Sequence, residues 1–412
     1  MNPNKSMTLI GTAIVIAAAG GSGVAVAGID GSGATKPKNK ITKGPVTGFG
    51  SVFVNGVRFD TDYALFLING EFGSESELEV GQIVTVHGWV NADGATGQAM
   101  LVTYDDAIQG PVDHIDVSAG HLDVLGHSVI VDDDTAFSDE LSSLADLALS
   151  DVVEVSGYAD ASGHIRATHI GIESGDDDFD LHGIVDLVDS ADLRIVINGV
   201  EIDYSAANLL GFEFGQPEVG ARVRIVAVER DDDGDLVATR IERRTSSLMA
   251  AAGAEVSIEG LITGSSSLFG FEIDGVPVRL RWGTEFVNGS LFGLAPDARI
   301  DVEGRFDDDG VLIADRIEFE RSAELSTRGT VQAVFGDALM VDGRIVRVTP
   351  ETGYDDRSVA DQRRFNVGDV RPGDSVEIRG YESGSVLMAT WLQRNGAVES
   401  EPRSFGDIDE RD

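Results

Sequence analysis

Apolar and polar positions alternate along this chain in short runs that are separated by turn residues. The segment Gly50–Asp60, GSVFVNGVRFD, holds two such runs that meet at Asn55-Gly56. An Asn-Gly pair between alternating runs is typical of a β-hairpin with a tight turn. The same shape returns in Leu193–Asp203 (LRIVINGVEID) and Gly270–Leu280 (GFEIDGVPVRL). The pattern therefore predicts one hairpin that occurs in several copies.

Five segments repeat the same order of predicted strands, each starting with a glycine. The leading glycines are Gly44, Gly110, Gly183, Gly260 and Gly329. The expected hairpin turns are Asn55-Gly56, Leu125-Gly126, Asn198-Gly199, Asp274-Gly275 and Asp342-Gly343. Leucine is unusual at the first central position of such a turn, where Asn, Asp or Gly is preferred. The sequence therefore predicts the second hairpin turn least well. The last strand of every copy has an alanine at one equivalent place, where a small residue suits a close crossing over the core: Ala99, Ala167, Ala238, Ala314 and Ala389.

Each copy contains about five predicted short strands in roughly sixty residues. A sheet of this size can either stay open at its two edge strands or close into a barrel. A flat sheet of this size would leave two edges open and one apolar face wet. Closing the sheet into a five-stranded Greek-key barrel removes both problems. We therefore predict an all-β chain, a tandem array of about five small OB-like β-barrels of roughly 60–70 residues each. A unit this small is marginal alone, and tandem copies can cover one another.

The predicted division of the chain follows these copies. We expect barrels at residues 44–109, 110–173, 183–244, 257–321 and 326–395. The remaining segments are a signal peptide (1–27), a flexible basic tail (28–43), an acidic linker (174–182), a linker (245–256) and a disordered acidic tail (396–412). The signal peptide prediction rests on Lys5, the apolar segment Thr8–Gly20 and the small residues Ala25–Ala27. It implies a periplasmic or extracellular protein, with no stable membrane span after signal cleavage and no cysteine for a lipid anchor.

The net charge of −40 is unevenly distributed. All five lysines precede Gly44, whereas residues 44–182 carry 26 acidic side chains against Arg58 and Arg166, a net −24. Such a surface repels phosphate backbones, so nucleic acid is excluded as the expected partner. Excess carboxylates are also typical of proteins that work in high salt. On that alternative explanation the acidic composition reflects the environment of the protein and not its activity.

The stretch GPVTGFGSVFVNGVRFD after GIDGSG, together with the strand-final ATHI and ATRI steps, resembles the secreted bacterial domain-of-unknown-function family numbered 5666. The resemblance spans about Gly28–Arg394. Many members of that family are expected lipoproteins with a cysteine before the Gly-rich start, where this chain has Ala27-Gly28, so surface anchoring is not implied. The resemblance implies no known activity.

All seven histidines lie between residues 87 and 182, within the most acidic part of the chain. Imidazoles beside carboxylates suit zinc, nickel or copper when thiolates are absent, so a divalent cation is the one cofactor the sequence offers. The candidate ligands are His114, His121, His127, His164 and His169, with Asp231, Asp233, Asp307 and Asp309 in two Asp-rich turns. The alternative is exposed strand histidines and plain hairpin turns, because Leu236 and Leu312 stand where a calcium loop needs glycine.

The sequence offers no obvious carrier of covalent catalysis. There is no cysteine, no lysine after Lys43 and no Gly-x-Ser-x-Gly elbow, so we expect no enzyme. Aromatic residues available for a ligand platform, if not used in the core, are Phe49, Phe53, Trp89, Phe269, Phe271, Trp282 and Trp391. We predict a secreted, non-enzymatic binding or scaffolding protein with a protein or polysaccharide partner outside the cytoplasm. The alternatives are a divalent-cation-binding protein centred on the second repeat, and a polysaccharide- or peptide-binding surface protein.

Overall fold

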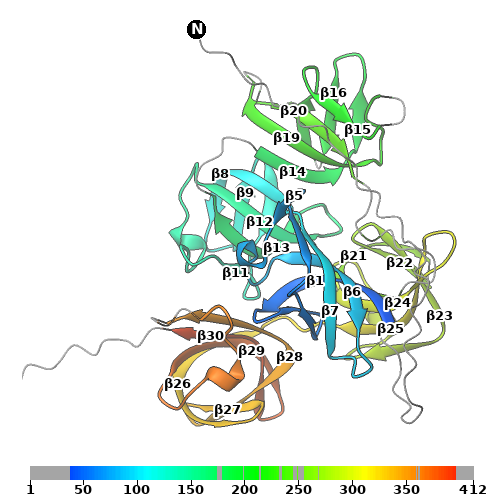
Figure 1. Cartoon of the computed structure of the whole chain (residues 1–412). Coiled ribbons are helices and arrows are strands. Elements are labelled where there is room, and N and C mark those ends of the chain that lie inside the picture. The colour runs from blue at the N-terminus through cyan, green and yellow to red at the C-terminus, as the bar shows by residue number, and fades with distance from the viewer. Residues whose placement is uncertain are drawn as a thin grey trace, which may run out of the picture. The chain divides into compact units, whose positions relative to one another are not determined.

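The computed structural model describes residues 38–173, 179–197, 199–212, 215–231, 234–244, 248, 255–267, 269–358, 360 and 362–395 (Figure 1). In these ranges the chain forms β-strands and four short 3-10 turns: η1 (Glu75–Glu77), η2 (Leu144–Asp146), η3 (Leu291–Gly293) and η4 (Val367–Asp369). None of the helical segments described is long and apolar enough to cross a membrane. The predicted all-β class is confirmed.

The first repeat closes its sheet into a ring. Its strands are β1 (Lys38–Gly48), β2 (Val52–Val54), β3 (Val57–Asp60), β6 (Ile83–Val90) and β7 (Thr96–Tyr104), with the hairpin β4 (Leu65–Ile68) and β5 (Glu71–Gly73) added beside β7. β1 pairs antiparallel with β2 and β6, β2 with β3, and β6 with β7, whereas β3 and β7 run parallel. This ring order is the five-stranded Greek-key barrel of the OB-fold, and it leaves no free edge.

The other four repeats close in the same order, each with its third and fifth strands parallel. The second barrel contains β8 (Ile108–Asp116), β9 (His121–Val124), β10 (His127–Ile130), β12 (Val152–Ala159) and β13 (Ile165–Ile172), with β11 (Ala136–Phe137) beside β13. The third contains β14 (Phe179–Ile184) and β15 (Leu187–Asp189) as one bent strand, β16 (Arg194–Ile197), β17 (Val200–Asp203), β19 (Arg222–Arg230) and β20 (Leu236–Arg243), with β18 (Asn208–Leu210) beside β20.

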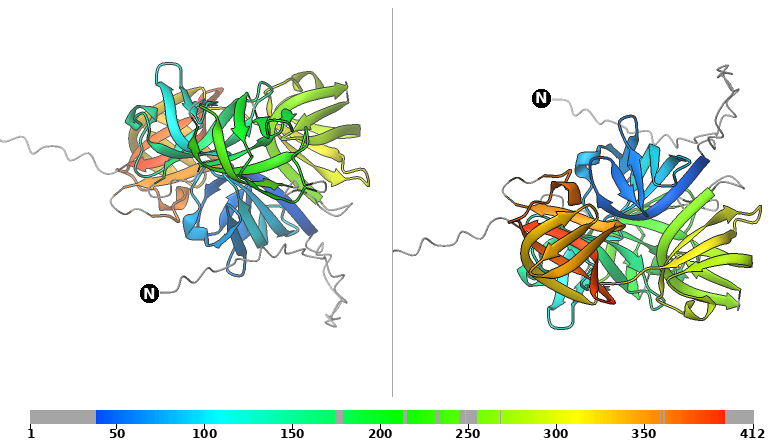
Figure 2. Two further views of the ribbon diagram at one scale, coloured as in Figure 1. Left: turned by 90° about the horizontal axis from the view of Figure 1, so that it is seen from above. Right: turned by 90° about the horizontal axis from the view of Figure 1, so that it is seen from below.

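The fourth barrel contains β21 (Glu255–Ser267), β22 (Gly270–Ile273), β23 (Val276–Val287), β24 (Arg299–Phe306) and β25 (Leu312–Phe319). The fifth contains β26 (Leu325–Phe335), β27 (Ala338–Val341), β28 (Arg344–Arg357), β29 (Ser375–Ser383) and β30 (Val386–Asn395), drawn from orange to red in Figure 1. Two further views show the strands of each repeat curving around their own barrel (Figure 2). The predicted tandem array of small OB-like barrels is confirmed.

The barrels are also joined through their backbones. β1 pairs parallel with β21, and β8 pairs antiparallel with β14, so that barrels one and four share a sheet, as do barrels two and three. The first-strand segment Phe179–His182 was expected in the acidic linker but lies in β14, and Glu255 begins β21 inside the other expected linker. Both expected linkers are therefore shorter than predicted, because strand pairing extends into their polar residues.

The basic tail expected at residues 28–43 is wrong for its last six residues. Lys38–Lys43 form the first half of β1, where the backbone pairs with β6 on one side, and from Lys40 onward with β21 on the other. The Nζ of Lys38 lies 2.9 Å from Glu255 Oε1, and the Nζ of Lys40 lies 2.9 Å from Glu303 Oε1. The lysines thus pair with carboxylates of the fourth barrel instead of remaining a solvated tail.

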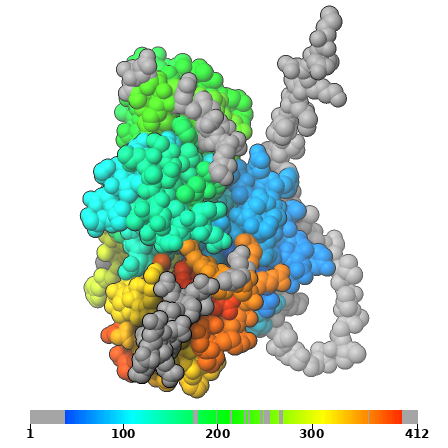
Figure 3. Space-filling model, turned by 90° about the vertical axis from the view of Figure 1, so that its left-hand side faces the viewer, coloured from blue at the N-terminus to red at the C-terminus, as the bar shows by residue number. Residues whose placement is uncertain are grey.

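Each barrel interior is filled by the apolar residues of the alternating runs. Separate buried clusters fill barrels one, four and five, and one continuous cluster fills barrels two and three, which share a sheet. In the space-filling view the side chains of the second repeat, in cyan and blue-green, close over its interior on the face shown (Figure 3). These interiors leave ligands only the outer faces and the loops.

In the four hairpin turns whose two central residues are both described, both residues have positive φ. The φ angle is 46° at Asn55 and 68° at Gly56, the signature of a type I′ turn. Leu125 and Gly126 adopt 51° and 80°, so the second hairpin has the same turn although the sequence defined it least. The left-handed region costs an L-residue about 1–2 kcal/mol. Leu125 offsets this cost by burying its side chain completely in the core.

The fourth and fifth strands cross closely at the repeated alanine. In the fourth barrel Gly304 pairs with Ala314 at a β-bulge, and Ala314 is fully buried. A Cβ on Gly304 would lie 2.1 Å from the carbonyl oxygen of Ile313. The equivalent pairs are Gly88 with Ala99, Gly157 with Ala167, Ala227 with Ala238 and Gly380 with Ala389.

We expect Gly304→Ala to destabilise the fourth barrel by about 1–3 kcal/mol, because the added methyl group must displace a strand backbone. Gly264→Ala on β21 of the same barrel is the matched control, since the nearest atom to its Cβ would be Glu272 Oε2 at 3.9 Å. The control should change stability by less than about 0.5 kcal/mol. Differential scanning calorimetry measures both, and equal melting of the two variants would contradict the close crossing.

Candidate functional site

The fourth barrel projects a tryptophan from its third strand. β23 pairs with β25 regularly as far as Leu280, and the pairing resumes only at Glu285. The intervening residues Arg281–Thr284 therefore bulge out of the sheet. Trp282 lies at the tip of this bulge and its side chain is fully exposed, at 102% of the reference area. A large apolar ring held in solvent by a defined bulge is a candidate contact point for a ligand.

A threonine hydroxyl holds the bulge in place. Thr284 Oγ1 accepts a hydrogen bond from the backbone N–H of Arg281 at 3.1 Å and donates one to the carbonyl oxygen of Ala314 at 2.8 Å. Gly283 supplies the positive φ, 94°, that turns the chain back. The tip is thereby tied to the rigid crossing point of the barrel, so the position of Trp282 is set by ordered backbone.

The second and fifth barrels have the same threonine-bonded bulge, with different residues at its tip. Thr135 and Thr352 also donate to the carbonyl oxygen of the repeated alanine, at 2.9 and 2.7 Å. The residues that correspond to Trp282 are Asp133 and Pro350. The carbonyl oxygen of Asp133 accepts a hydrogen bond from Arg379 Nη1 at 3.2 Å, so that tip serves a contact within the protein. The fourth barrel alone among these three carries an aromatic tip.

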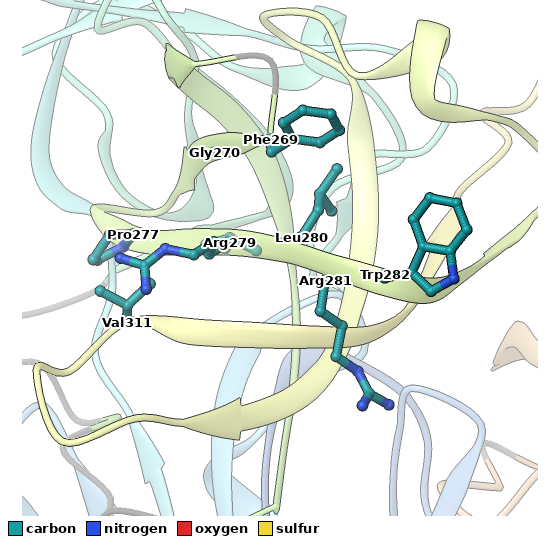
Figure 4. Close-up of a pocket in the computed structure, with 9 residues that line it drawn as sticks. Phe269, Gly270, Pro277, Arg279, Leu280, Arg281, Trp282 and Val311 are labelled. Atoms are coloured by element: carbon teal, nitrogen blue, oxygen red, sulfur yellow. The ribbon is translucent and has the colours of Figure 1, made fainter.

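A hollow of about 590 Å³ lies beside this tip. It is lined by Phe269, Gly270, Pro277, Val278, Arg279, Leu280, Arg281, Trp282 and Val311. The rings of Phe269 and Trp282 lie on the same side of β23 as Leu280, whereas Arg281 points to the opposite side (Figure 4). Phe269 is 56% exposed and Leu280 packs on the barrel core, so the apolar interior continues outward onto this face.

Two arginines line the hollow, each paired with an aspartate, and Arg281 lies on the side of β23 opposite to the two rings (Figure 4). Arg281 Nη2 lies 2.7 Å from Asp315 Oδ1, and Arg279 Nη1 lies 3.5 Å from Asp307 Oδ2. Both arginines are more than half exposed. Each pair presents hydrogen-bond donors next to acceptors, which suits a polar ligand without net charge.

The position of this hollow within the barrel topology is also informative. It covers the second and third strands, β22 and β23, with Phe269 in the loop before β22 and Val311 in the loop after β24. In OB-folds the face of strands two and three and these same two loops bind oligonucleotides and oligosaccharides. The aromatic hollow therefore lies where this barrel type binds chains.

The histidines predicted as metal ligands lie in different surroundings. His121 Nε2 lies 2.6 Å from Ser128 Oγ, and the rings of His114 and His121 are 6.4 Å apart. His164 Nδ1 lies 3.3 Å from Asp160 Oδ2.

His127 and His169 are both buried, in different surroundings. Burial lowers the pKa of His127, which favours its neutral form. His169 Nδ1 lies 3.0 Å from the carbonyl oxygen of Val80, and its Nε2 lies 3.1 Å from Glu79 Oε2. The hydrogen bond from His169 lowers the pKa of Glu79. The described geometry brings only His114 and His121 of the five side by side, so metal binding by this set stays a prediction.

The aspartates of the two Asp-rich turns cap those turns. Asp231 Oδ1 accepts a hydrogen bond from the backbone N–H of Asp235 at 3.0 Å. Asp307 Oδ1 accepts from the backbone N–H groups of Asp309 and Val311 at 3.0 and 2.9 Å. Asp309 itself is exposed, and Asp233 lies outside the described residues. The two capping carboxylates thus have a structural use in their own hairpins.

Among the aromatic residues considered from the sequence, Phe49, Phe271 and Trp391 are buried, while Phe269 and Trp282 are exposed. The sequence left Trp282 open between the core and a ligand platform, because the apolar alternation from Val276 continues through it and only the following Gly283 marks where the strand leaves the sheet. Sequence reasoning missed the two arginines and the threonine of the bulge. The Trp-Gly-Thr step was the one signal that could have revealed it.

Comparison with known proteins identifies the repeat but no activity. The family model described as Domain of unknown function (DUF5666) matches residues 43–99, 109–171, 182–242, 259–318 and 328–393. Among solved structures, a chain described as drosophila Unr CSD456 is similar at 12% identity, over 52% of this chain and 97% of that chain, with a TM-score of 0.15. A TM-score this low carries no argument. No curated protein matches the chain.

Proposed function

The chain belongs to the Domain of unknown function (DUF5666) family, in five tandem copies, and we propose that it is a non-enzymatic oligosaccharide-binding protein. The binding face is that of β22 and β23 on the fourth barrel. The other barrels contribute a covalently linked scaffold. The family description names no activity, so the proposal depends on the geometry of this chain.

The observation that carries the proposal is the exposed Trp282 beside Phe269. An indole ring in solvent forgoes the stabilisation that burying its large apolar area would give. Packing the C–H face of a sugar ring on the indole recovers part of it, and the Arg279–Asp307 pair offers a donor and an acceptor for hydroxyl groups. A second ring at Phe269 gives the hollow room for more than one sugar unit.

Charge favours oligosaccharides over the other chains that OB-folds bind. A net charge of −40 repels phosphate backbones, and both arginines that line the hollow are already paired with aspartates. A neutral sugar chain meets neither obstacle. We propose that binding takes place outside the cytoplasm, in keeping with the leader-like segment at residues 1–27.

The test is a glycan array probed with the purified chain, followed by titration calorimetry with the best ligand. Trp282→Ala should weaken binding at least about tenfold, which corresponds to about 1.4 kcal/mol, because a central tryptophan supplies a large share of contact energy. Thermal unfolding should stay within about 0.5 kcal/mol of the parent, since Trp282 is exposed.

Phe335→Ala is the matched control, because Phe335 is another exposed ring, 61% accessible, on the fifth barrel. It should bind like the parent. Equal affinity of the Trp282 variant, or binding only to peptides or nucleic acid, would contradict the proposal.

A further inference from the structure

Three side chains of the first three barrels converge at one buried point. Asp106 lies in the connection between β7 and β8, and Asp180 and His182 lie on β14. One carboxylate oxygen of each aspartate and one imidazole nitrogen all lie within 4.8 Å of one another. His182 Nε2 is 3.4 Å from Asp180 Oδ1 and 3.8 Å from Asp106 Oδ1.

In the described part of the chain, the three converging atoms have no hydrogen-bond partner. Asp106 is 2% exposed and Asp180 is 5% exposed. Asp106 Oδ1, Asp180 Oδ1 and His182 Nε2 are buried and make no hydrogen bond to any described residue. Buried polar atoms are normally satisfied, and leaving carboxylate oxygens unsatisfied is costly. A cation placed between these three atoms would satisfy all of them.

The other oxygen of each carboxylate already accepts a hydrogen bond. Asn69 Nδ2 donates to Asp106 Oδ2 at 3.2 Å, and Arg224 Nε donates to Asp180 Oδ2 at 2.7 Å. Arg224 Nη1 also donates to the carbonyl oxygen of Asn69 at 2.6 Å, so the two residues that bind the carboxylates are hydrogen-bonded to each other. Each carboxylate is thus oriented so that its free oxygen faces the histidine, as outer partners orient the ligands of a metal.

The electrostatics agree with a site that attracts a cation. Burial raises the pKa of Asp106 well above its usual range, and the negative charges of Asp180 and Glu154 raise it further. Burial also acts to raise the pKa of Asp180, but His182 and Arg224 outweigh it and lower the net value. Arg224 compensates the charge of Asp180, whereas no arginine or lysine of the described residues forms an ion pair with Asp106, so a cation at this point would compensate the second carboxylate.

We propose that Asp106, Asp180 and His182 bind one divalent transition cation, with zinc as the best match. Zinc bonds of about 2.0–2.2 Å to oxygen and nitrogen place tetrahedral ligands about 3.4 Å apart, close to the observed separations. Two carboxylates with one imidazole suit borderline cations, whereas calcium prefers six to eight oxygen ligands. This site is independent of the face on the fourth barrel and would tie the β7–β8 connection to the third barrel.

The test uses the full chain after EDTA treatment and dialysis, titrated with ZnCl₂ by calorimetry and by thermal unfolding. We expect one zinc ion per chain and a higher melting temperature with zinc. His182→Ala and Asp106→Asn should each weaken zinc binding more than about tenfold. The asparagine variant keeps the buried volume, so it remains informative if the alanine variant folds poorly.

His87→Ala is the matched control, because His87 is a partly buried histidine on β6 of the first barrel and is not among the candidate ligands. It should retain the parental zinc affinity, and calcium should bind more weakly than zinc. Absence of zinc binding by the folded parent would overturn the proposal. So would parental affinity in both ligand variants, loss of binding only in the His87 variant, or equal affinity for calcium.

Discussion

Replacing Arg394 by methionine is expected to destabilise the fifth barrel by about 3–5 kcal/mol, because the change leaves a buried carboxylate without its cation. Arg394 on β30 lies directly opposite Asp356 on β28. Arg394 Nε donates to Asp356 Oδ1 at 2.8 Å, and the Asp356 side chain is only 1% exposed. Methionine retains the apolar stem of arginine, so the loss isolates the charge from the packing.

The pair also fixes the connection between β28 and η4. Backbone N–H groups of Ser358 and Gln362 donate to the two Asp356 oxygens at 3.1 and 2.8 Å, and the guanidinium of Arg394 stacks 4.6 Å from the centre of the Phe365 ring. Burial acts to raise the pKa of Asp356, but the bonds from Arg394 and the backbone outweigh it and hold the pKa well below its usual range. The stabilisation is therefore present above about pH 4 and is lost as the pH falls further.

The matched control is Arg344→Met in the same barrel. Arg344 pairs with Glu382 at 3.4 Å, but both side chains are about half exposed. Exposed pairs contribute at most about 1 kcal/mol. Urea unfolding followed by hydrogen exchange of the β28 and β30 amides would separate the two. Similar stability of both variants at pH 7 would contradict the assigned role of the buried pair.

The second large effect has the opposite sign. Asp301→Asn should stabilise the fourth barrel at pH 8 by about 3–4 kcal/mol, because it removes a buried charge that lacks a close cation. Asp301 is 8% exposed and accepts hydrogen bonds from Ser257 Oγ at 3.0 and 3.1 Å, which asparagine can still accept through its carbonyl oxygen. Burial, with a smaller contribution from Glu303, raises the pKa of Asp301 to about 7.

The sign of the pH dependence follows from this raised pKa. In the unfolded chain Asp301 loses its proton near pH 4, whereas in the barrel it keeps the proton until about pH 7. Stability contributed by the protonated form is fully present below pH 4 and is lost as the pH rises towards 7, by about 1.4 kcal/mol per unit. The advantage of the asparagine variant should therefore grow over this interval and level off above pH 7.

Calorimetric melting at pH 5 and pH 8 measures this growth. Asp308→Asn is the control for removing one negative charge, because Asp308 is exposed in the turn between β24 and β25. The control should show the same difference from the parent at both pH values. An Asp301 variant that behaves like this control would show that the buried carboxylate is not the source of the pH dependence.

The sequence predicted the fold well where local chemistry decides it. Turn pairs such as Asn55-Gly56 fix a type I′ hairpin, and period-two alternation sets which side chains enter the barrel. Lys38–Lys43 were misjudged because the partners that order them, such as Glu255, are on a distant repeat. Nothing in the local pattern of that segment indicates a strand.

The candidate sites were harder to predict for the same physical reason. Trp282 continues the alternation of a core strand, and its exposure depends on the bulge that Thr284 holds. Asp106 and His182 belong to different repeats, so only the pairing of β8 with β14 brings their elements together. The five histidines grouped by sequence share a region of the chain but lie in different surroundings in the structure.

The most direct test of the proposed function is the accessibility of Trp282 to acrylamide with and without the oligosaccharide selected on the array. Of the three tryptophans, Trp282 is fully exposed, Trp89 is partly buried and Trp391 is buried, so the quenchable emission reports chiefly on the tip of the bulge. We expect saturating oligosaccharide to protect this emission from quenching in the parent and to have no effect in Trp282→Phe. Unchanged quenching of the parent at saturation would contradict binding at this face.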